Sequence, residues 1–228
     1  MPLTPVKQIA LRDALVDQIR DLILTGELRP GDRIIEYKLA REMHVGQNSV
    51  REALAVLEQQ GLVTRVPNKG AQVTKLSPED MEHIYAVRIL LEGMAVKFAK
   101  QHMRLVDADK LQQVIEKMRA AFHDNDVVAF CNADFEFHRK LWGFSNNLYL
   151  VKALSSIVAP QFAHILIKSM KWPREDMLPI IEEHQAILNF LKNEDAETAA
   201  AEVTRIIERL RDFAMNVVRQ SDEKFSVA

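Results

Sequence analysis

The sequence predicts a mainly α-helical protein: an N-terminal winged helix-turn-helix followed by a C-terminal antiparallel bundle of six helices. Three observations lead to this fold class. Glycine and proline divide only the first third of the chain into short pieces. Apolar residues recur at helical spacing through most of the remainder. Two stretches of alternating apolar and polar residues end the first third, where they predict a small β-hairpin.

The first domain, residues 1–76, is predicted to hold three short helices and the hairpin. The expected elements are helices at 9–24, 36–43 and 47–60 and strands at 62–66 and 71–74. Gly61 ends the third helix, because glycine adopts the left-handed conformation that commonly closes a helix. Three helices followed by a hairpin predict a winged helix.

The second domain, residues 77–228, begins at a strong helix-start signal. Ser77 offers a hydroxyl N-cap, Pro78 suits the first helical position, and Glu79 and Asp80 suit the positive end of the helix dipole. Six helices are expected from here on, at about 79–101, 107–124, 126–144, 147–170, 174–192 and 195–219.

The composition leads us to expect a cytoplasmic protein. Of 228 residues, 48% are hydrophobic, which suffices for folded cores. The apolar runs are shorter than the roughly 20 residues that span a bilayer, and the N-terminus has no secretory pattern. Cys131 is the single cysteine, which excludes an intrachain disulfide and suits a small buried apolar role. We therefore expect no membrane-spanning segment.

The turn between the second and third helices predicts DNA binding. His44-Val45-Gly46 is short enough to cross the two helices steeply, so that the third helix can enter the major groove. That helix opens with Gln47, Asn48 and Ser49, and Arg51 follows one turn later, so donors and acceptors gather at its N-terminus. A structural alternative remains open, in which these polar residues only cap the helix. Net charge, −2, does not decide between them.

The motifs of the first domain resemble those of GntR-type regulators over about residues 8–76. They are Leu28-Arg29-Pro30-Gly31-Asp32-Arg33, Leu39-Ala40, Val50-Arg51-Glu52-Ala53-Leu54, Leu57, Gly61-Leu62-Val63 and Gly70. The resemblance implies operator contacts at Tyr37, Gln47, Asn48, Ser49, Arg51, Lys69 and Gly70, the last two at the wing tip. Gly46-Gln47 stands where the family commonly has serine or threonine followed by arginine, so one expected arginine contact is missing.

Two residues of the second domain suggest a metal site. Asp134 and His138 are four residues apart, so they lie on one face of a helix and could share an ion. His184 lies on a later predicted helix. The alternative is structural, because a histidine in a helix is more often a surface or core residue than a ligand.

The second domain resembles the FCD effector domain of the FadR subfamily, in its VanR-like branch. The motifs are Arg88-Ile89-Leu90-Leu91-Glu92, Asp134-Phe135-Glu136-Phe137-His138, Asn147 with Leu150, Glu183-His184-Gln185-Ala186-Ile187 and Asp195-Ala196-Glu197-Thr198-Ala199. Metal-binding members use one aspartate and three histidines, which implies Asp134, His138 and His184 as ligands here, with Ile206 at the fourth position. Three ligands can still hold zinc or nickel, and His164 is a conceivable substitute.

Arg88 has two interpretations. It lies one turn before Glu92, which suits a structural ion pair, and its planar guanidinium equally suits the carboxylate of a bound effector. The aromatic residues Phe135, Phe137, Trp142 and Phe162, like Met170, are expected in the core.

These features predict a transcription regulator rather than an enzyme. A homodimeric repressor would place two winged helices on a palindromic operator, and a small organic acid would modulate its affinity for DNA. The alternatives are a direct metal sensor and a metal-dependent hydrolase, for which Glu136 and Glu183 are the available general bases.

Overall fold

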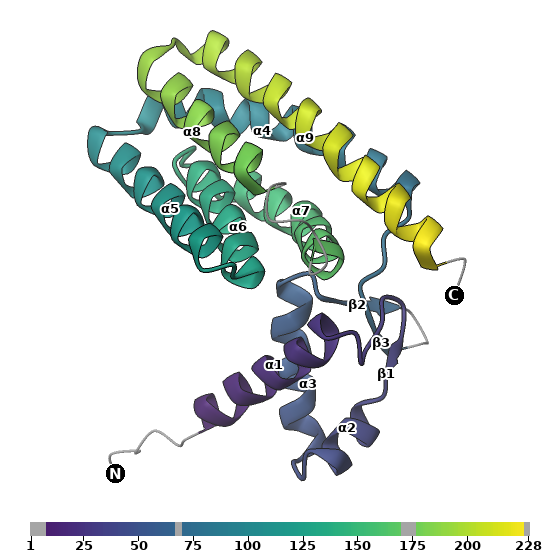
Figure 1. The fold of residues 1–228 in the computed structure, drawn as a ribbon. Helices are drawn as coiled ribbons and strands as arrows, with labels where there is room; N and C mark the ends of the chain where they lie inside the picture. The colour runs from purple at the N-terminus through teal and green to yellow at the C-terminus, as the bar shows by residue number, and fades with distance from the viewer. Residues whose placement is uncertain (1–7, 67–69, 170–176, 226–228) are drawn as a thin grey trace, which may run out of the picture. The chain divides into compact units, whose positions relative to one another are not determined.

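The computed structural model describes residues 8–66, 70–169 and 177–225. The chain divides into two compact units, the first ending at Lys75 and the second beginning at Leu76. Nine helices and three short strands make up the described part, which confirms the prediction of a mainly α protein (Figure 1).

The first unit is a winged helix-turn-helix. Its helices are α1 (Gln8–Leu24), α2 (Glu36–Glu42) and α3 (Gln47–Gln59), and its strands are β1 (Arg33–Ile34), β2 (Val63–Val66) and β3 (Gly70–Val73). The strands form an antiparallel sheet in the order β1-β3-β2. The sequence predicted only β2 and β3, because the two residues of β1 are too few to show an alternating pattern.

Helices α1 and α3 pack against each other and hold the core of this unit. Their buried apolar residues include Leu15, Ile19, Ile23, Val50, Leu54 and Leu57. The turn between α2 and α3 contains His44 at φ 54, and the Val45 N–H closes it by donating to the Ala40 carbonyl at 3.0 Å. This core therefore holds α3 by its buried face and leaves the polar residues at its N-terminus exposed.

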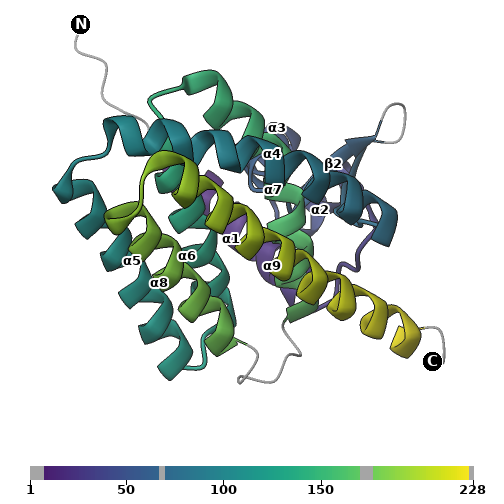
Figure 2. The same cartoon turned by 90° about the horizontal axis from the view of Figure 1, so that it is seen from above.

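The second unit is the predicted bundle of six helices. They are α4 (Pro78–His102), α5 (Leu105–His123), α6 (Val127–Gly143), α7 (Leu148–Ser169), α8 (Leu178–Asn193) and α9 (Ala196–Phe225). Helix α9 continues beyond its predicted end at residue 219, and the predicted start of α8 at residue 174 lies outside the described residues. Helix α4 runs alongside α9, while α5 packs against α6 and α8 (Figure 2).

Helix α4 begins as the sequence predicted. The Ser77 hydroxyl accepts from the Asp80 N–H at 3.1 Å, and the Asp80 carboxylate accepts from the Ser77 N–H at 2.9 Å. This capping box satisfies two backbone donors that the helix itself cannot. It fixes the point at which the second unit starts.

The bundle core confirms most of the expected apolar positions. Phe137, Trp142 and Phe162 are buried, and Phe135 is partly buried against them. Cys131, expected as a small buried apolar residue, is partly buried and packs against the core. Met170 lies outside the described residues.

Helix α7 is apolar enough to need separate mention. The segment Leu148–Ile167 could cross a membrane by length and composition, with a mean hydropathy of 1.5, and half of it is buried inside the structure. The sequence analysis expected no such segment. Helix α7 packs against α4 and α6, so its apolar residues serve the core of the bundle.

Candidate functional site

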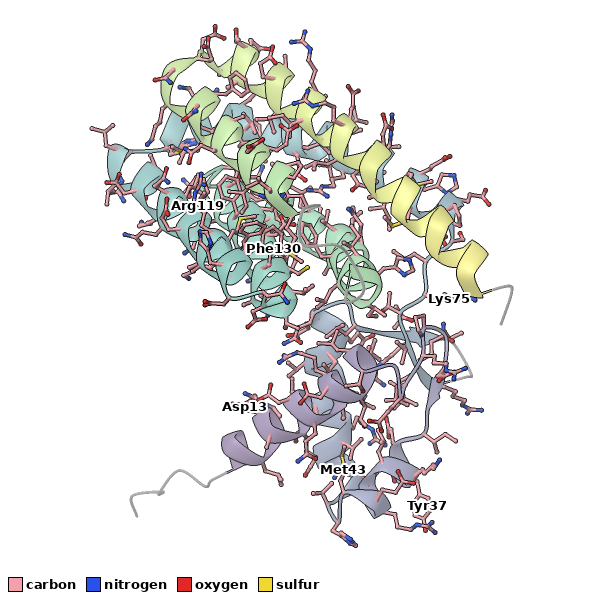
Figure 3. The ribbon with its side chains drawn as sticks, in the orientation of Figure 1. Asp13, Tyr37, Met43, Lys75, Arg119 and Phe130 are labelled. Atoms are coloured by element: carbon pink, nitrogen blue, oxygen red, sulfur yellow. The ribbon has the colours of Figure 1, made fainter. Side chains whose placement is uncertain are left out.

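The polar residues expected to contact DNA lie at the surface of the first unit. Tyr37 projects from α2 with 65% of its surface exposed (Figure 3). Gln47, Asn48 and Arg51 are exposed on α3, and Ser49 is partly exposed. Gly70 is exposed at the start of β3 with φ +83, a conformation that favours glycine, and Lys69 lies outside the described residues.

Glu36 ties two of these residues together. Its carboxylate accepts from Gln47 Nε2 at 3.1 Å and from Arg51 Nη2 at 2.9 Å. The hydrogen bond from Arg51 lowers the pKa of Glu36, and the bond from Gln47 adds to this effect against the opposing influence of partial burial. Glu36 therefore keeps its negative charge beside the start of α3.

The N-terminus of α3 has no side-chain cap. Gly46 occupies the N-cap position, and no side-chain hydrogen bond replaces the missing one. The polar start of α3 thus does not act as its own cap, which was the structural alternative. Its first backbone N–H groups remain suited to an anion such as a phosphate.

Asp134, His138 and His184 meet inside the second unit. One ligand atom from each residue lies within 4.8 Å of the others. Asp134 Oδ1 is 3.0 Å from His184 Nε2 and 3.6 Å from His138 Nε2. Helix α6 supplies the first two residues at the predicted four-residue spacing, and α8 supplies the third. Both histidines are fully buried.

Hydrogen bonds on the far side of each ring orient the two imidazoles. His184 Nδ1 lies 2.7 Å from the Ile180 carbonyl, which can only accept, so Nδ1 donates. His138 Nδ1 lies 3.1 Å from the Glu92 carboxylate and donates in the same way. In the neutral rings both Nε2 atoms then carry lone pairs, and Asp134 Oδ1 lies within 3.6 Å of each. Such outer hydrogen bonds are typical of metal-ligating histidines.

Two of these atoms have no hydrogen-bond partner among the described residues, namely Asp134 Oδ1 and His184 Nε2. A carboxylate oxygen and an imidazole lone pair at 3.0 Å repel each other unless a proton or a cation lies between them. The donor set of one carboxylate and two imidazoles suits a divalent transition metal. These residues therefore fit the metal that the sequence analysis expected.

Arg88 is fully buried beside this group. Its Nε donates to Glu92, as the structural interpretation predicted. Its Nη2 lies 3.2 Å from His138 Nε2, and its Nη1 lies 3.4 Å from Gln161 Oε1. The two interpretations of Arg88 are thus compatible, since the ion pair with Glu92 uses only Nε.

The charges of this cluster determine which of its groups are ionised. Burial is the largest single influence on Glu92 and would raise its pKa, but the charges of Arg88 and His138 and the hydrogen bonds from both residues together outweigh it, so the pKa is lowered. Burial and the charge of Arg88 lower the pKa of His138 against the opposing effect of Glu92. Burial raises the pKa of Tyr85, which lies next to Arg88, to about 12. Near neutral pH the cluster therefore holds an ionised Arg88–Glu92 pair and a neutral His138.

A small cavity opens onto these residues. Its polar wall contains Tyr85, Arg88, Asp134, His138 and Gln161, and its apolar wall contains Phe162, Ile165, Ile180, Leu210 and Ala214. The cavity volume is about 40 Å³, above the roughly 10–15 Å³ that one water molecule needs. The arrangement can receive a small anion on its polar side.

Other candidates lie away from this cavity. Ile206 is buried in the core of α9, so the fourth ligand position is aliphatic. His164 is not part of the ligand group, and its Nδ1 accepts from the Leu76 N–H at 3.3 Å. Glu136 is held by Lys117 at 2.9 Å and Glu183 by Arg209 at 2.9 Å. Neither possible general base lines the cavity, so neither is placed to activate water there, as the hydrolase interpretation requires.

Sequence reasoning missed three residues of this site. Glu92 was expected only as the partner of Arg88, yet it also orients His138. Gln161 and Tyr85 line the cavity and were not considered. Their positions within long apolar helical patterns gave no signal, because only the packing of α4 against α7 brings them together.

Comparison with known proteins supports both halves of the fold. Residues 11–73 match the model of the bacterial regulatory proteins of the gntR family, and residues 83–209 match the FCD domain. The Nta operon transcriptional regulator of Aminobacter aminovorans is 30% identical over 198 residues, 84% of this chain and 88% of that protein. An HTH-type transcriptional regulator of Bacillus subtilis, YdhC, is 29% identical over 189 residues, 82% of this chain and 83% of that protein.

Solved structures show the same fold. The structure of Escherichia coli McbR/YncC covers 90% of this chain and 97% of its own, with a TM-score of 0.72 at 22% sequence identity. A GntR regulator from Rhodococcus sp. RHA1 covers 91% of this chain and 98% of its own, with a TM-score of 0.70 at 21% identity. With both family models matched in their expected order, the chain is a DNA-binding transcription regulator of the GntR family whose C-terminal half is an FCD effector domain.

Proposed function

We propose that this regulator is a homodimeric repressor that releases operator DNA when a small organic acid binds its helical domain. Residues 1–76 would bind DNA, and residues 77–228 would bind the effector and form the dimer. The observation that carries the proposal is the cavity lined by Arg88, Asp134 and His138, the last two of which form a possible ligand group with His184. Among similar proteins, the gluconate operon protein of Bacillus licheniformis, 25% identical, is named a repressor.

Asp134, His138 and His184 would hold a divalent metal, zinc or nickel. Some FCD domains bind metals, and the unpartnered Asp134 Oδ1 and His184 Nε2 fit that use. Bound there, the ion would act as a Lewis acid that accepts an oxygen of the effector. Because Ile206 offers no fourth ligand, a position of the coordination shell stays open for that oxygen.

Arg88 would bind the carboxylate of the same effector. In this structure its Nη2 faces the lone pair of His138 Nε2 at 3.2 Å. With His138 as a ligand, its lone pair would no longer be available to Arg88, and Nη2 could donate to a carboxylate instead. The Arg88 Nε contact with Glu92 is unaffected by this exchange, so the guanidinium keeps its position. Ion and guanidinium together would then fix one carboxylate group.

The DNA contacts would come from Tyr37, Gln47, Asn48, Ser49, Arg51, Lys69 and Gly70. Arg51 and the N-terminus of α3 are suited to phosphates or base edges, and Gln47 replaces an arginine common in the family. Gln47 can pair with adenine rather than guanine, so we expect an operator that departs from the family's usual sequence.

A homodimer would form on an apolar face of the helical unit. Val87, Leu90 and Met94 lie at helical spacing on α4, and each is more than 40% exposed. Exposed apolar stripes of this kind commonly mark interfaces. Helix α4 also carries Arg88, so effector binding and subunit contact involve the same helix.

Signal transfer to the DNA-binding domain would pass through the start of α4. The Leu76 N–H, one residue before the Ser77 cap, donates to His164 on α7. Helix α7 also contributes Gln161 and Ile165 to the cavity. An effector that prefers one position of α7 would therefore shift the segment that follows the wing.

The test combines composition with DNA binding. Native mass spectrometry with elemental analysis of protein freshly purified from the cytoplasmic fraction of cells should show a dimer. Each chain should hold about one zinc or nickel ion. Gel-shift assays at moderate salt should show a sequence-dependent complex with DNA flanking its own gene. Absence of that complex would refute the regulatory role.

Metal loading separates the remaining alternatives. If zinc alone changes operator affinity and acids add nothing, the protein is a direct metal sensor. His184→Ala should abolish zinc binding, while Glu183→Ala on the same helix should not, because Glu183 pairs with Arg209. Turnover of ester or amide substrates by the zinc-loaded protein would instead support a hydrolase.

A further inference from the structure

Gln161 has a buried side-chain amide in which only the oxygen has a hydrogen-bond partner. The residue is fully buried on α7 and lines the effector cavity. Its Oε1 faces Arg88 Nη1 at 3.4 Å, and since arginine has donors only, the amide oxygen must be the atom on that side. The amide nitrogen therefore points away from Arg88.

The Gln161 Nε2 group has no hydrogen-bond partner among the described residues. The hydroxyl of Tyr85 is close enough for the amide to lower its pKa slightly against the raising effect of burial, but the pair does not reach hydrogen-bond geometry. A fully buried donor without an acceptor is unfavourable, and native proteins normally retain one only where a ligand or water completes it.

We propose that Gln161 determines effector specificity by donating to an acceptor oxygen next to the effector's carboxylate. The proposal rests on the function proposed above, in which Arg88 and the metal hold that carboxylate. Gln161 Oε1 lies 3.4 Å from Arg88 Nη1, so the other end of the same amide, Nε2, would lie within reach of an atom next to a carboxylate that Arg88 holds. A 2-hydroxy or 2-oxo group provides an acceptor at that position.

The remaining walls restrict the other end of the molecule. Phe162, Ile165, Ile180, Leu210 and Ala214 offer no charge to a second carboxylate. Burying an unpaired carboxylate against them would be strongly unfavourable. The small cavity also disfavours long chains. The structure thus selects short 2-hydroxy or 2-oxo monocarboxylates over dicarboxylates and over unsubstituted acids.

The experiment compares matched acids on the full-length protein. Isothermal titration calorimetry would measure propanoate, 2-hydroxypropanoate, 2-oxopropanoate and butanedioate, with equimolar zinc present. Wild type should bind one of the substituted acids about tenfold more tightly than propanoate, the effect of about one good hydrogen bond. Butanedioate should bind more weakly than either.

Gln161→Met isolates the amide, because methionine has nearly the same length and no donor. Methionine also removes the acceptor of Arg88 Nη1, so the affinity for every acid can change, but the preference for the substituted acid over propanoate should disappear. Gln161→Leu serves the same purpose with a different shape, and thermal unfolding establishes that each variant is folded. A tenfold preference that survives in a folded variant would overturn the assignment, because the metal alone would then explain it.

The two proposals fail in different ways. If wild type binds all four acids without preference, the role of Gln161 is wrong and the effector site stands. If wild type binds none of them, or if Arg88→Met binds them as wild type does, the effector site itself is wrong and the role of Gln161 falls with it.

Discussion

Each unit of this regulator contains an arginine–glutamate pair, and the two pairs differ in their access to water. Arg51 and Glu36 have 52% and 19% of their side chains exposed, whereas Arg88 and Glu92 have 3% and 0%. An exposed pair gains little from its attraction, because water and salt compete for both charges. A buried pair is difficult to separate, because neither charge can return to water.

The difference matches what each arginine is expected to do. Arg51 can exchange Glu36 for a DNA phosphate at little cost, so its present partner only orients it. Arg88 keeps Glu92 through Nε and offers its other two nitrogens to the cavity. An exposed arginine of an ion pair can therefore leave its partner to bind another anion, whereas a buried one stays in place as part of a site.

The largest expected effect is on the buried pair. Glu92→Gln would remove the charge that compensates Arg88 and leave one acceptor oxygen for two donors, Arg88 Nε and His138 Nδ1, so the free energy of unfolding should fall by about 3–5 kcal/mol. Urea denaturation at fixed protein concentration measures this. Glu36→Gln, the matched change in the exposed pair, should cost below about 1 kcal/mol. Equal losses in the two variants would remove the distinction between the pairs.

Removing Arg51 tests whether this residue exchanges Glu36 for a contact with DNA. Arg51→Ala should weaken operator binding about tenfold to a hundredfold, the range for one important base or phosphate contact, and leave the unfolding midpoint almost unchanged. Fluorescence anisotropy with labelled operator measures the affinity. Arg209→Ala is the control, because it breaks a comparable ion pair with Glu183 in the helical unit. An equal loss in the control would indicate a general effect of charge.

Glu36→Gln should tighten DNA binding by about threefold at moderate salt. The substitution removes a negative charge from beside the start of α3 and weakens the hold on Arg51 and Gln47. Salt titrations of the anisotropy signal should show the gain shrinking as ionic strength rises. Asp17→Asn, which neutralises the partner of Arg20 on α1, should produce less change. Weaker binding by the Gln variant would mean that Glu36 positions Arg51 for DNA.

The smallest effect is the pH dependence of Glu36. Its pKa in the folded protein is lowered from 4.5, chiefly by the hydrogen bond from Arg51, so its stabilising contribution is complete above about pH 4.5 and is lost as pH falls through the lowered value. The stability difference between wild type and Glu36→Gln, below about 1 kcal/mol, should disappear over that window. Thermal unfolding from pH 6 to pH 3 measures it. A difference that grows on acidification would contradict the assignment.

Helix periodicity and end signals predicted most of the fold. The capping box at Ser77 and the glycines of the first unit are local features, so their consequences can be inferred from neighbouring residues. Strand β1 has only two residues and exists because β3 offers it an edge, which no local pattern reveals.

The candidate site was only partly predictable for the same reason. The spacing of Asp134 and His138 is local to α6, the family resemblance joined His184 to them, and the planar guanidinium suggested Arg88. The contacts of Glu92 with His138 and of Gln161 with Arg88 join residues 46 and 73 positions apart. Such contacts depend on how α4, α6 and α7 pack, and a single sequence does not encode that packing in any short motif.

The uncapped start of α3 gives the DNA a structural role of its own. Gly46 leaves the first turn of the recognition helix without the side-chain acceptor that most helices have, so this end should fray more readily in free protein. A phosphate oxygen seated there would supply the missing acceptor and complete the helix. Part of the binding free energy would then be used to order this turn, and the recognition helix would be fully formed only when the operator is bound.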